Sequence, residues 1–469
     1  MLFRSIHWPF TRVNAPAAPR PRARSYISRM RVLIIGGGGR EHAIAWKLAQ
    51  EEPAVELIAA PGNPGIAELA ECVNIGVLDL DALEQLARSR SVDFTIVGPE
   101  APLAAGIVDR FRAAGLAIFG PTRAAAEIET SKAFAKRMML EDEIPTARAE
   151  SHTNVSAAKD AARRFGAPVV IKASGLAGGK GVIVCDTIAH ADRAIDDMLE
   201  GNRFGAAGAE VLIEEFMEGE ELSVFAITDG TSFLLLPGLQ DHKRLLDTDA
   251  GPNTGGMGAY VPVTLGLRPD RPVSDGGTAA REIIARTLRG LAARGRPFTG
   301  LLYAGLMMTR DGPKVVEFNC RFGDPETQAL LPVLVGEHRL IDLMRTVAVG
   351  DSVPHGIAET RGACVTTVLA AGNYPDAPRT GDPITLPAAA DGIFVFHAGT
   401  ARHADGRLVT SGGRVIAVSA TGETVAIAQQ RSLEYARRVE FRGKQLRTDI
   451  GWREIAREQE RAHAGTARN

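Results

Sequence analysis

Residues 169–184 read VVIKASGLAGGKGVIV, which is two short apolar runs joined by a loop that contains four glycines. The loop is not a Walker loop, because Ser174 stands where a glycine is required and a strand follows instead of a helix. Backbone amides of a glycine-rich loop can close over phosphates, and Lys172 and Lys180 add positive charge. A plain hairpin is the alternative, although it rarely needs four glycines and two lysines. The stretch therefore predicts a phosphate-covering flap between two strands.

The segment before this flap alternates short strands with helices. Val32–Ile35 is apolar, Gly36–Gly39 follows, and His42–Gln50 has a helical pattern, as in a parallel α/β domain. The dinucleotide-binding pattern fails because Glu41 occupies the position of its third glycine, which disfavours a nicotinamide-dependent oxidoreductase. The loop can still bind a phosphate at a helix N-terminus, or it can be a tight turn without a ligand.

Residues 314–326, KVVEFNCRFGDPE, carry the second group of polar residues. Alternate residues of a strand share a face, so Val315, Glu317 and Asn319 are expected to point the same way, and Arg321 continues that face. A carboxylate beside an amide oxygen suits Mg²⁺, and the arginine could clamp a carboxylate or a phosphoryl group. A structural acid–arginine cluster is the alternative interpretation.

Two further segments are less specific. IEEFMEGEE (213–221) can offer backbone groups to an adenine edge and Glu221 to ribose hydroxyls, although an acidic strand exit is more often a solvated edge. LQDHKRLLDTDAGPNTGGMGAY (239–260) has no regular period, and a loop of this length in a compact domain is usually functional.

The order of these motifs resembles the ATP-grasp superfamily. The stretches 31–45, 97–104, 171–182, 241–260 and 317–328 narrow the resemblance to the phosphoribosylamine–glycine ligase (glycinamide ribonucleotide synthetase) family of de novo purine biosynthesis, over about residues 30–452. The resemblance implies that ATP phosphorylates the glycine carboxylate. The amine of 5-phosphoribosylamine then attacks the glycyl phosphate, which gives glycinamide ribonucleotide, ADP and phosphate. A carboxylate–amine ligase of this kind works mostly by positioning and charge neutralisation.

The resemblance also implies roles for individual residues. The nucleotide is expected to contact ten of them: Lys132, Lys172, Gly178, Gly179 and Lys180 at the phosphates, Glu214, Glu215, Phe216 and Met217 at adenine, and Glu221 at ribose. Glu317 and Asn319 are expected to bind Mg²⁺ or Mn²⁺ without a third acid, because the preceding strand, 302–308, has none. Catalysis is expected from Arg321, Lys172 and Asp324, the last also contacting the glycine ammonium. The substrate candidates are Asn63, Glu100, Asp241, Asn253, Gly255, Gly256 and Arg321.

The predicted architecture is multidomain, with α/β and α+β parts. A parallel α/β domain at 30–131 precedes an ATP-grasp domain at 132–353, whose flap subdomain covers about 145–220, and a small mixed β/α domain at 354–455. Residues 1–29, with six arginines, four prolines and no acid, are expected to be a disordered leader. A transit peptide or a start at Met30 are the alternatives. A charged tail at 456–469 is expected to be frayed, as is the whole stretch after Trp452.

Composition narrows the class further. The formal charge of −2 argues weakly against a nucleic-acid partner, and no apolar run reaches 18 residues, so no membrane partner is expected. Four dispersed cysteines are typical of a reducing compartment, here the cytoplasm. We expect glycine, 5-phosphoribosylamine and ATP as ligands, and a monomer or weak homodimer. Of 54 basic residues nine are lysines, and four of these lie in the ligand motifs.

Two other functions remain compatible with the ATP-grasp motifs. One is a ligase or carboxylase with a different acceptor, against which the DHKR (241–244) and NTGGMGAY (253–260) segments argue. The other is an inactive ATP-binding module, against which the retention of Lys132, Lys172, Glu317 and Asn319 argues.

Overall fold

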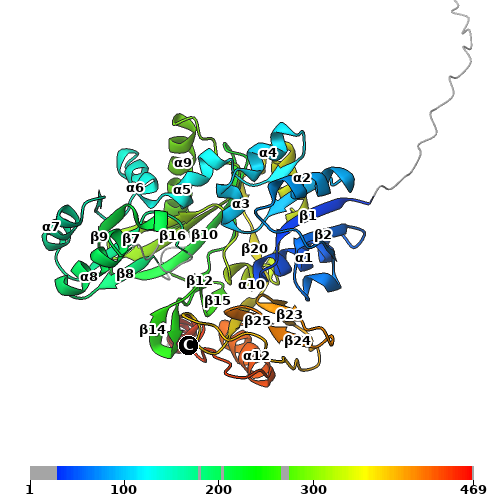
Figure 1. Cartoon of the computed structure of the whole chain (residues 1–469). Helices are drawn as coiled ribbons and strands as arrows, with labels where there is room; N and C mark the ends of the chain where they lie inside the picture. The colour runs from blue at the N-terminus through cyan, green and yellow to red at the C-terminus, as the bar shows by residue number, and fades with distance from the viewer. Residues whose placement is uncertain (1–28, 178–180, 202–204, 266–273, 467–469) are drawn as a thin grey trace, which may run out of the picture.

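The computed structural model describes residues 29–177, 181–201, 205–265 and 274–466. The predicted leader, except Arg29, and the flap residues Gly178, Gly179 and Lys180 lie outside the described residues. The chain forms an N-terminal part, a central part with two sheets and a C-terminal part (Figure 1). The predicted combination of α/β and α+β parts is confirmed.

A parallel sheet forms the N-terminal part, with strand order β3-β2-β1-β4-β5. Buried apolar residues of β1 and β4 fill its core, because both faces of a parallel sheet are covered. The strands are β1 (Arg31–Gly36), β2 (Glu56–Pro61), β3 (Glu71–Cys72), β4 (Phe94–Val97) and β5 (Ile118–Phe119), and the helices are α1 (Gly39–Glu51), α2 (Leu80–Ser89), α3 (Glu100–Ala104) and α4 (Ile107–Ala113).

The central part contains two sheets. The smaller is antiparallel, with order β6-β9-β7-β8, and its strands are β6 (Ala149–His152), β7 (Val169–Ala173), β8 (Val182–Cys185) and β9 (Val211–Glu215). Helices α7 (Val155–Phe165) and α8 (Ile188–Leu199) pack on it. The larger has order β17-β16-β10-β11-β19, with β10 (Glu220–Thr228), β11 (Phe233–Leu235), β16 (Gly300–Thr309), β17 (Gly312–Asn319) and β19 (Gly356–Ile357). Three helices belong to this part, α5 (Arg123–Thr130), α6 (Lys132–Glu141) and α9 (Ser274–Ala293).

The C-terminal part contains a five-stranded sheet, and two of its strands begin within the segment 239–260. Its order is β12-β15-β21-β25-β22, with β12 (Gln240–Asp241), β15 (Gly258–Val261), β21 (Ala363–Ala370), β22 (Ile393–His397) and β25 (Arg414–Gly422). The expectation of an irregular loop at 239–260 is therefore wrong. β15 pairs with β21, about a hundred residues further along the chain, and local periodicity cannot reveal such a partner. The domain boundaries themselves stay a prediction.

The remaining described elements are the strands of three two-stranded sheets and several helices. They are η1 (Ile66–Glu68), η2 (Gly205–Gly208), β13 (Arg244–Leu246), η3 (Asp247–Asp249), β14 (Ala250–Asn253), α10 (Glu326–Leu330), β18 (Leu334–Val335), α11 (Leu340–Val349), β20 (Glu359–Thr360), β23 (Thr400–Arg402), β24 (Leu408–Thr410), α12 (Val425–Arg438) and α13 (Trp452–Thr466). None of the helices in the described ranges is long and apolar enough to span a membrane.

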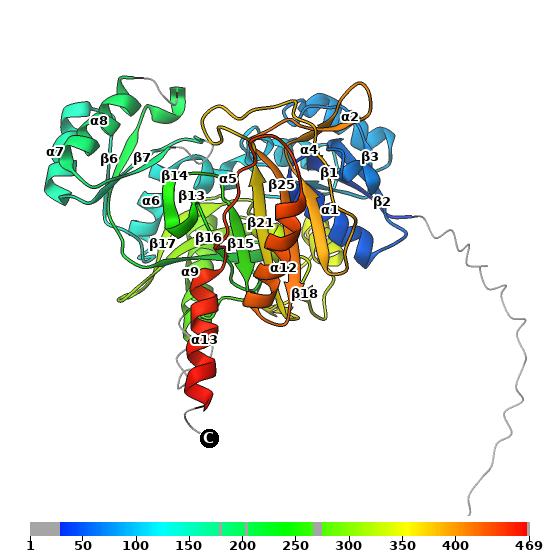
Figure 2. The same cartoon turned by 90° about the horizontal axis from the view of Figure 1, so that it is seen from below.

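Two local expectations need correction. Strand β17 has a bulge, since Gly305 pairs with Glu317 but Leu306 pairs with Val315. The extra residue reverses the alternation, so Val315 is buried in the core with Phe318 and does not share a face with Glu317. The end of the chain is also not frayed as far as it is described, because α13 continues to Thr466 and projects from the body of the molecule (Figure 2).

A substitution of Arg447 tests how strongly the stability of the fold depends on contacts between the segment 244–253 and the C-terminal part. Its buried guanidinium lies 2.8 Å from Asp249 and 2.8 Å from Asp449. We expect Arg447→Met to lower the free energy of unfolding by about 3 kcal/mol, because it leaves carboxylates without their partner.

The matched control is Arg407→Met, which removes an exposed arginine 2.6 Å from Asp405. Its effect should stay below about 1 kcal/mol. Urea unfolding of both variants measures the difference, and equal midpoints would contradict the structural role of Arg447.

Candidate active site

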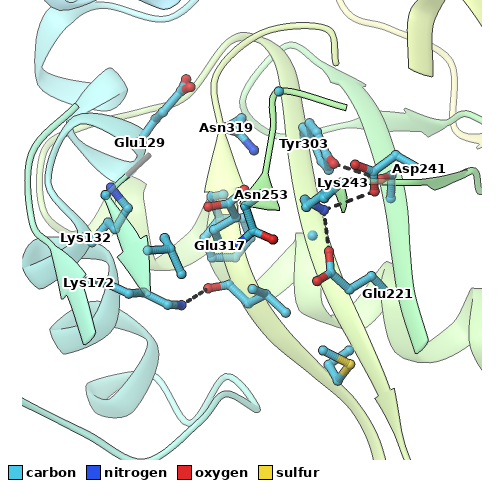
Figure 3. A pocket seen from close by; sticks show the side chains of 18 of the residues that line it. Glu129, Lys132, Lys172, Glu221, Asp241, Lys243, Asn253, Tyr303, Glu317 and Asn319 are labelled. Carbon is cyan, nitrogen blue, oxygen red and sulfur yellow. Dashed lines mark hydrogen bonds and ion pairs between the residues drawn. The ribbon is translucent and has the colours of Figure 1, made fainter. Parts of the chain in front are cut away.

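A cavity of about 730 Å³ lies where the three parts of the chain meet. Its walls include Arg40 and Glu100 from the N-terminal part, both central sheets, and Arg414 and Arg453 from the C-terminal part. Figure 3 shows lysines and acids of several elements converging on this space. The cavity therefore depends on how all three parts are placed.

Two lysines share one buried carboxylate, that of Glu214 on β9, which is an inner strand of the flap sheet (β6-β9-β7-β8). Lys172 Nζ on β7 lies 2.6 Å from Glu214 Oε2, and Lys136 Nζ on α6 lies 3.1 Å from Glu214 Oε1. Burial opposes ionisation of Glu214, but the two ammonium groups hold its pKa below the usual value. Lys132 Nζ donates to Gly175 O at 3.0 Å, where the flap begins. Burial lowers the pKa of Lys132, against the opposing charge of Glu317.

The segment proposed to hold adenine lies at the exit of β9. Phe216 and Met217 line the cavity beside Glu214, which places them on its wall as expected. Glu215 also lines it, while its carboxylate binds Arg148 at 2.6 Å. The contact of this segment with adenine stays a prediction.

The two proposed metal ligands both line the cavity. Glu317 and Asn319 lie on β17 after the bulge, so they share the cavity side of the strand. A carboxylate and an amide oxygen form a hard donor pair, which suits Mg²⁺ or Mn²⁺ when phosphate oxygens complete the shell. Among the described residues, no group of three or more His, Cys, Asp or Glu could hold a metal ion, so these two residues would depend on the nucleotide.

Arg321 is held at the end of β17 by groups that leave one N–H unused. Its Nη2 lies 3.2 Å from Glu129 Oε1 and 3.2 Å from Asn319 Oδ1. Its buried Nε has no hydrogen-bond partner and is 3.6 Å from Glu100 Oε2. Burial alone would lower the pKa of Arg321, but Glu129 and Glu100 raise it. The guanidinium is therefore a fixed cation suited to a carboxylate or an acyl phosphate.

Glu129 is a cavity-lining residue to which no role was assigned from the sequence. It lies on α5, and its Oε2 accepts a hydrogen bond from Cys320 N at 2.7 Å, beside Arg321. Burial raises the pKa of Glu129, while Arg321 opposes that shift. Its position shortly before Lys132 was the available signal, but only the fold brings α5 to the end of β17.

The loop after Arg321 receives two further arginines. Arg40 Nη1 donates to Phe322 O at 3.0 Å, and Arg414 Nη1 donates to Asp324 O at 2.6 Å. Burial opposes ionisation of Asp324, but Arg414 and Arg40 lower its pKa. An ionised Asp324 in the cavity wall is compatible with a contact to the glycine ammonium.

Asp241 and Glu221 meet at Lys243, a third residue that was not assigned a role. Lys243 Nζ lies 3.0 Å from Asp241 Oδ1 and also bonds Glu221 (Figure 3). Burial raises the pKa of Asp241 to about 6, and Lys243 opposes the shift. Tyr303 OH, hydrogen-bonded to Glu326 at 2.7 Å, closes the wall beside them. The single positive charge of Lys243 thus offsets part of the negative charge of two acids that would otherwise repel a polyanionic ligand.

The remaining substrate candidates separate into two groups. Glu100, Asn253 and Gly255 line the cavity. Asn63 does not, because its amide group donates to Gly37 O and His397 O and accepts from the backbone N–H of Gly65 and Ile66. Those four bonds fix the side chain of Asn63, and its contact with the substrate stays a prediction. Gly256 also lies outside the lining, where its positive φ of 111° and the approach of Pro325 require a glycine.

Comparison with known families follows the same three parts. Residues 30–129, 130–327 and 364–453 match the models described as the N domain, the ATP-grasp (A) domain and the C domain of phosphoribosylglycinamide synthetase. The chain belongs to the phosphoribosylamine–glycine ligase family. The resemblance seen in the motifs is thereby confirmed, as is the class of ATP-grasp carboxylate–amine ligase.

Relatives in this family align over nearly their whole length. The phosphoribosylamine–glycine ligase of Xylella fastidiosa is 50% identical over 435 residues, which is 92% of this chain and 98% of that protein. The ligase of Vibrio parahaemolyticus is 49% identical over 440 residues, 92% of this chain and all of that protein. The crystal structure of the Thermotoga maritima phosphoribosylamine–glycine ligase has a TM-score of 0.79 and 35% identity, covering 90% of this chain and 100% of that one.

A second group of solved structures shares the fold only. The biotin carboxylase domain of the Hydrogenobacter thermophilus 2-oxoglutarate carboxylase has a TM-score of 0.67 at 18% identity, covering 89% of this chain and 91% of that chain. The shared fold therefore does not identify the acceptor substrate, whereas membership of the ligase family does.

Lys172 provides the sharpest test of this ligase site. Its ammonium is buried between Glu214 and Val316 O, so Lys172→Arg forces a larger planar group into a closed space. We expect KM for ATP to rise by about ten-fold or more, as measured by steady-state kinetics.

The control is Lys159→Arg on α7, whose ammonium pairs with Asp196 at the surface of the same subdomain. It should leave KM for ATP unchanged. Near-normal ATP affinity in Lys172→Arg would mean that a lysine at this position is incidental.

Proposed function

We propose that this chain ligates glycine to 5-phosphoribosylamine with ATP, through a glycyl phosphate intermediate, and so makes glycinamide ribonucleotide for purine biosynthesis. The observation that carries the proposal is one cavity that contains Lys132, Lys172, Glu317, Asn319 and Arg321 in a chain of the ligase family. No side-chain nucleophile is needed, because phosphate is a good leaving group once the carboxylate is phosphorylated.

The chain's own residues supply fixed positive charge around the transferring phosphoryl group. Lys132 and Lys172 lie on the flap side of the cavity, and Arg321 lies at the opposite end of β17 with an unused N–H. Charges that are already held in place need no reorganisation when a transition state develops, which is the main source of electrostatic catalysis. Arg321 would therefore stabilise the acyl phosphate, and Asp324 would orient the glycine ammonium.

Glu317 and Asn319 are proposed to hold Mg²⁺ or Mn²⁺ together with the nucleotide. When bound, the ion would neutralise charge on the phosphates during transfer. The acceptor amine is proposed to approach from the side of Glu100, Asp241 and Asn253, which line the cavity away from the flap. Glu221, already fixed by Lys243, would accept from the ribose hydroxyls.

We also propose the partners, the oligomeric state and the cellular location of the enzyme. The enzyme is expected to act on small molecules without a nucleic-acid or membrane partner, as a monomer or weak homodimer. A cytoplasmic location is supported by four free cysteines, at positions 72, 185, 320 and 364.

The assignment is tested by measuring ADP release with each substrate omitted in turn. We expect ADP formation only when glycine and 5-phosphoribosylamine are both present with Mg²⁺, because the intermediate is consumed by the amine. Release of ADP that ignores either substrate would contradict the proposed reaction.

Glu317→Gln tests the metal ligands. The amide keeps the size of the side chain but removes its charge, so we expect kcat to fall by at least about ten-fold and the Mg²⁺ requirement to rise. The control is Glu282→Gln on α9, an exposed carboxylate that pairs with Arg286. Unchanged kinetics in Glu317→Gln, with Mg²⁺ titrated, would show that the metal assignment is wrong.

A further inference from the structure

The C-terminal helix α13 reaches the wall of the cavity. Arg453 in its first turn lines the cavity, and its Nε lies 3.8 Å from Glu220 Oε2. One turn later, Arg457 Nη1 donates to both carboxylate oxygens of Glu220, at 3.1 and 3.2 Å. Glu220 begins β10 and immediately precedes Glu221, the proposed ribose contact.

A second route joins α13 to the same two residues. Arg457 Nη2 lies 3.4 Å from the hydroxyl of Tyr260, which donates to Gln240 Oε1. Gln240 Nε2 then donates to the backbone oxygen of Glu221 at 2.8 Å and approaches the Glu220 carboxylate at 3.3 Å. Both the side chain of Glu220 and the backbone of Glu221 are therefore fixed from the direction of α13.

The helix itself is anchored independently of these contacts. Glu454, almost fully buried, accepts from the backbone N–H of Thr264 at 3.0 Å. Glu458 accepts from the first N–H groups of α12, Val425 at 2.9 Å and Ala426 at 3.2 Å, which satisfies otherwise unpaired donors of a helix N-terminus. Ile455 packs against the small apolar cluster that contains Tyr260 and Val425. The first two turns of α13 are thus held in place, and the arginines extend toward β10.

We propose that α13 completes the nucleotide site, and that Arg457 is a positioning residue that sets Glu220 and Glu221 for the ribose of ATP. The proposal rests on the proposed function, which assigns Glu221 to the ribose. Arg457 lies beyond residue 453, where the match to the C-domain model ends.

The charges around β10 explain why Arg457 should affect the binding of ATP. Glu220, Glu221 and Asp241 are three neighbouring carboxylates, and Lys243 contacts only the last two. Glu220 depends on Arg457 and, at longer range, on Arg453 for its counter-charge. Without Arg457, Glu220 would repel Glu221 and add negative charge at the site of a polyanionic nucleotide. ATP affinity should therefore fall, whereas glycine contacts at Arg321 should not change.

The test compares Arg457→Gln with Arg461→Gln, one turn further along α13. Arg461 binds Glu454 at 3.0 Å and Thr264 at 2.7 Å, so the control removes an ion pair at Glu454, which Arg457 Nε also contacts at 2.9 Å, and leaves the contacts of Arg457 with Glu220 in place. We expect Arg457→Gln to raise KM and the calorimetric Kd for ATP on the order of ten-fold, which corresponds to about 1.4 kcal/mol. KM for glycine and kcat should stay within about two-fold, and Arg461→Gln should match the unmodified chain.

Two further variants separate positioning from general stability. Arg457→Lys keeps the charge and should recover part of the ATP affinity. The double variant Arg457→Gln/Glu220→Gln should bind ATP no worse than Arg457→Gln alone, because the pair acts as a unit. An unchanged Kd for ATP in Arg457→Gln, or an equal rise of KM for all substrates with a lowered Tm, would overturn the proposal. Loss of glycine dependence in the unmodified chain would refute the proposed function instead, and the calorimetric ATP affinities would still decide the role of Arg457.

Discussion

The site depends on a buried carboxylate, Glu214, held between two ammonium groups. An ionised group removed from water is unstable unless it is paired, so β9 cannot take its place without Lys172 of β7 and Lys136 of α6. The triad therefore does two things at once. It ties helix α6 to the flap sheet, and it keeps both lysines in fixed positions in the wall of the cavity.

Around Arg321 and Asp324, charged groups in the cavity wall are likewise paired, here with arginines as the cations. Arg321 is paired with Glu129 of α5, and Arg414 of β25 lies 3.4 Å from Asp324, so each pair joins elements that are distant in the sequence. Each cation is thereby paired with a carboxylate, yet the Nε of Arg321 has no hydrogen-bond partner and lies 3.6 Å from Glu100 Oε2. A substrate that enters the cavity can then replace weak contacts of charged groups that are already in place. Because these groups need not reorganise when charge develops in the transition state, the barrier to the reaction is lower.

How much of this was predictable from sequence depended on the range of each interaction. The apolar run Val32–Ile35 lies within β1, and the run that precedes the glycine-rich loop forms β7, because burial on both faces leaves a nearly continuous apolar run. The bulge that moves Val315 into the core depends on pairing with β16, and β15 is a strand because it pairs with β21 and with β12. The contacts of Asn63 were not predictable for a related reason, since a short polar residue in a glycine loop looks the same whether it contacts a ligand or the backbone of His397. Local patterns identified the site, whereas long-range pairing decided which residues face it.

The positions of the few lysines in this chain can be explained by the contacts that a buried cation must make. Four of the nine lysines, 132, 136, 172 and 243, line the cavity, and Lys243 and Lys136 each contact more than one acceptor from a single ammonium. Lys444, which does not line the cavity, does the same for the carbonyls of Ala436, Arg437 and Val439 at the end of α12. A compact ammonium can serve acceptors in several directions, whereas a planar guanidinium requires acceptors near its own plane. Retention of lysine therefore reflects the geometry of convergent acceptors, of which a phosphate group is one example.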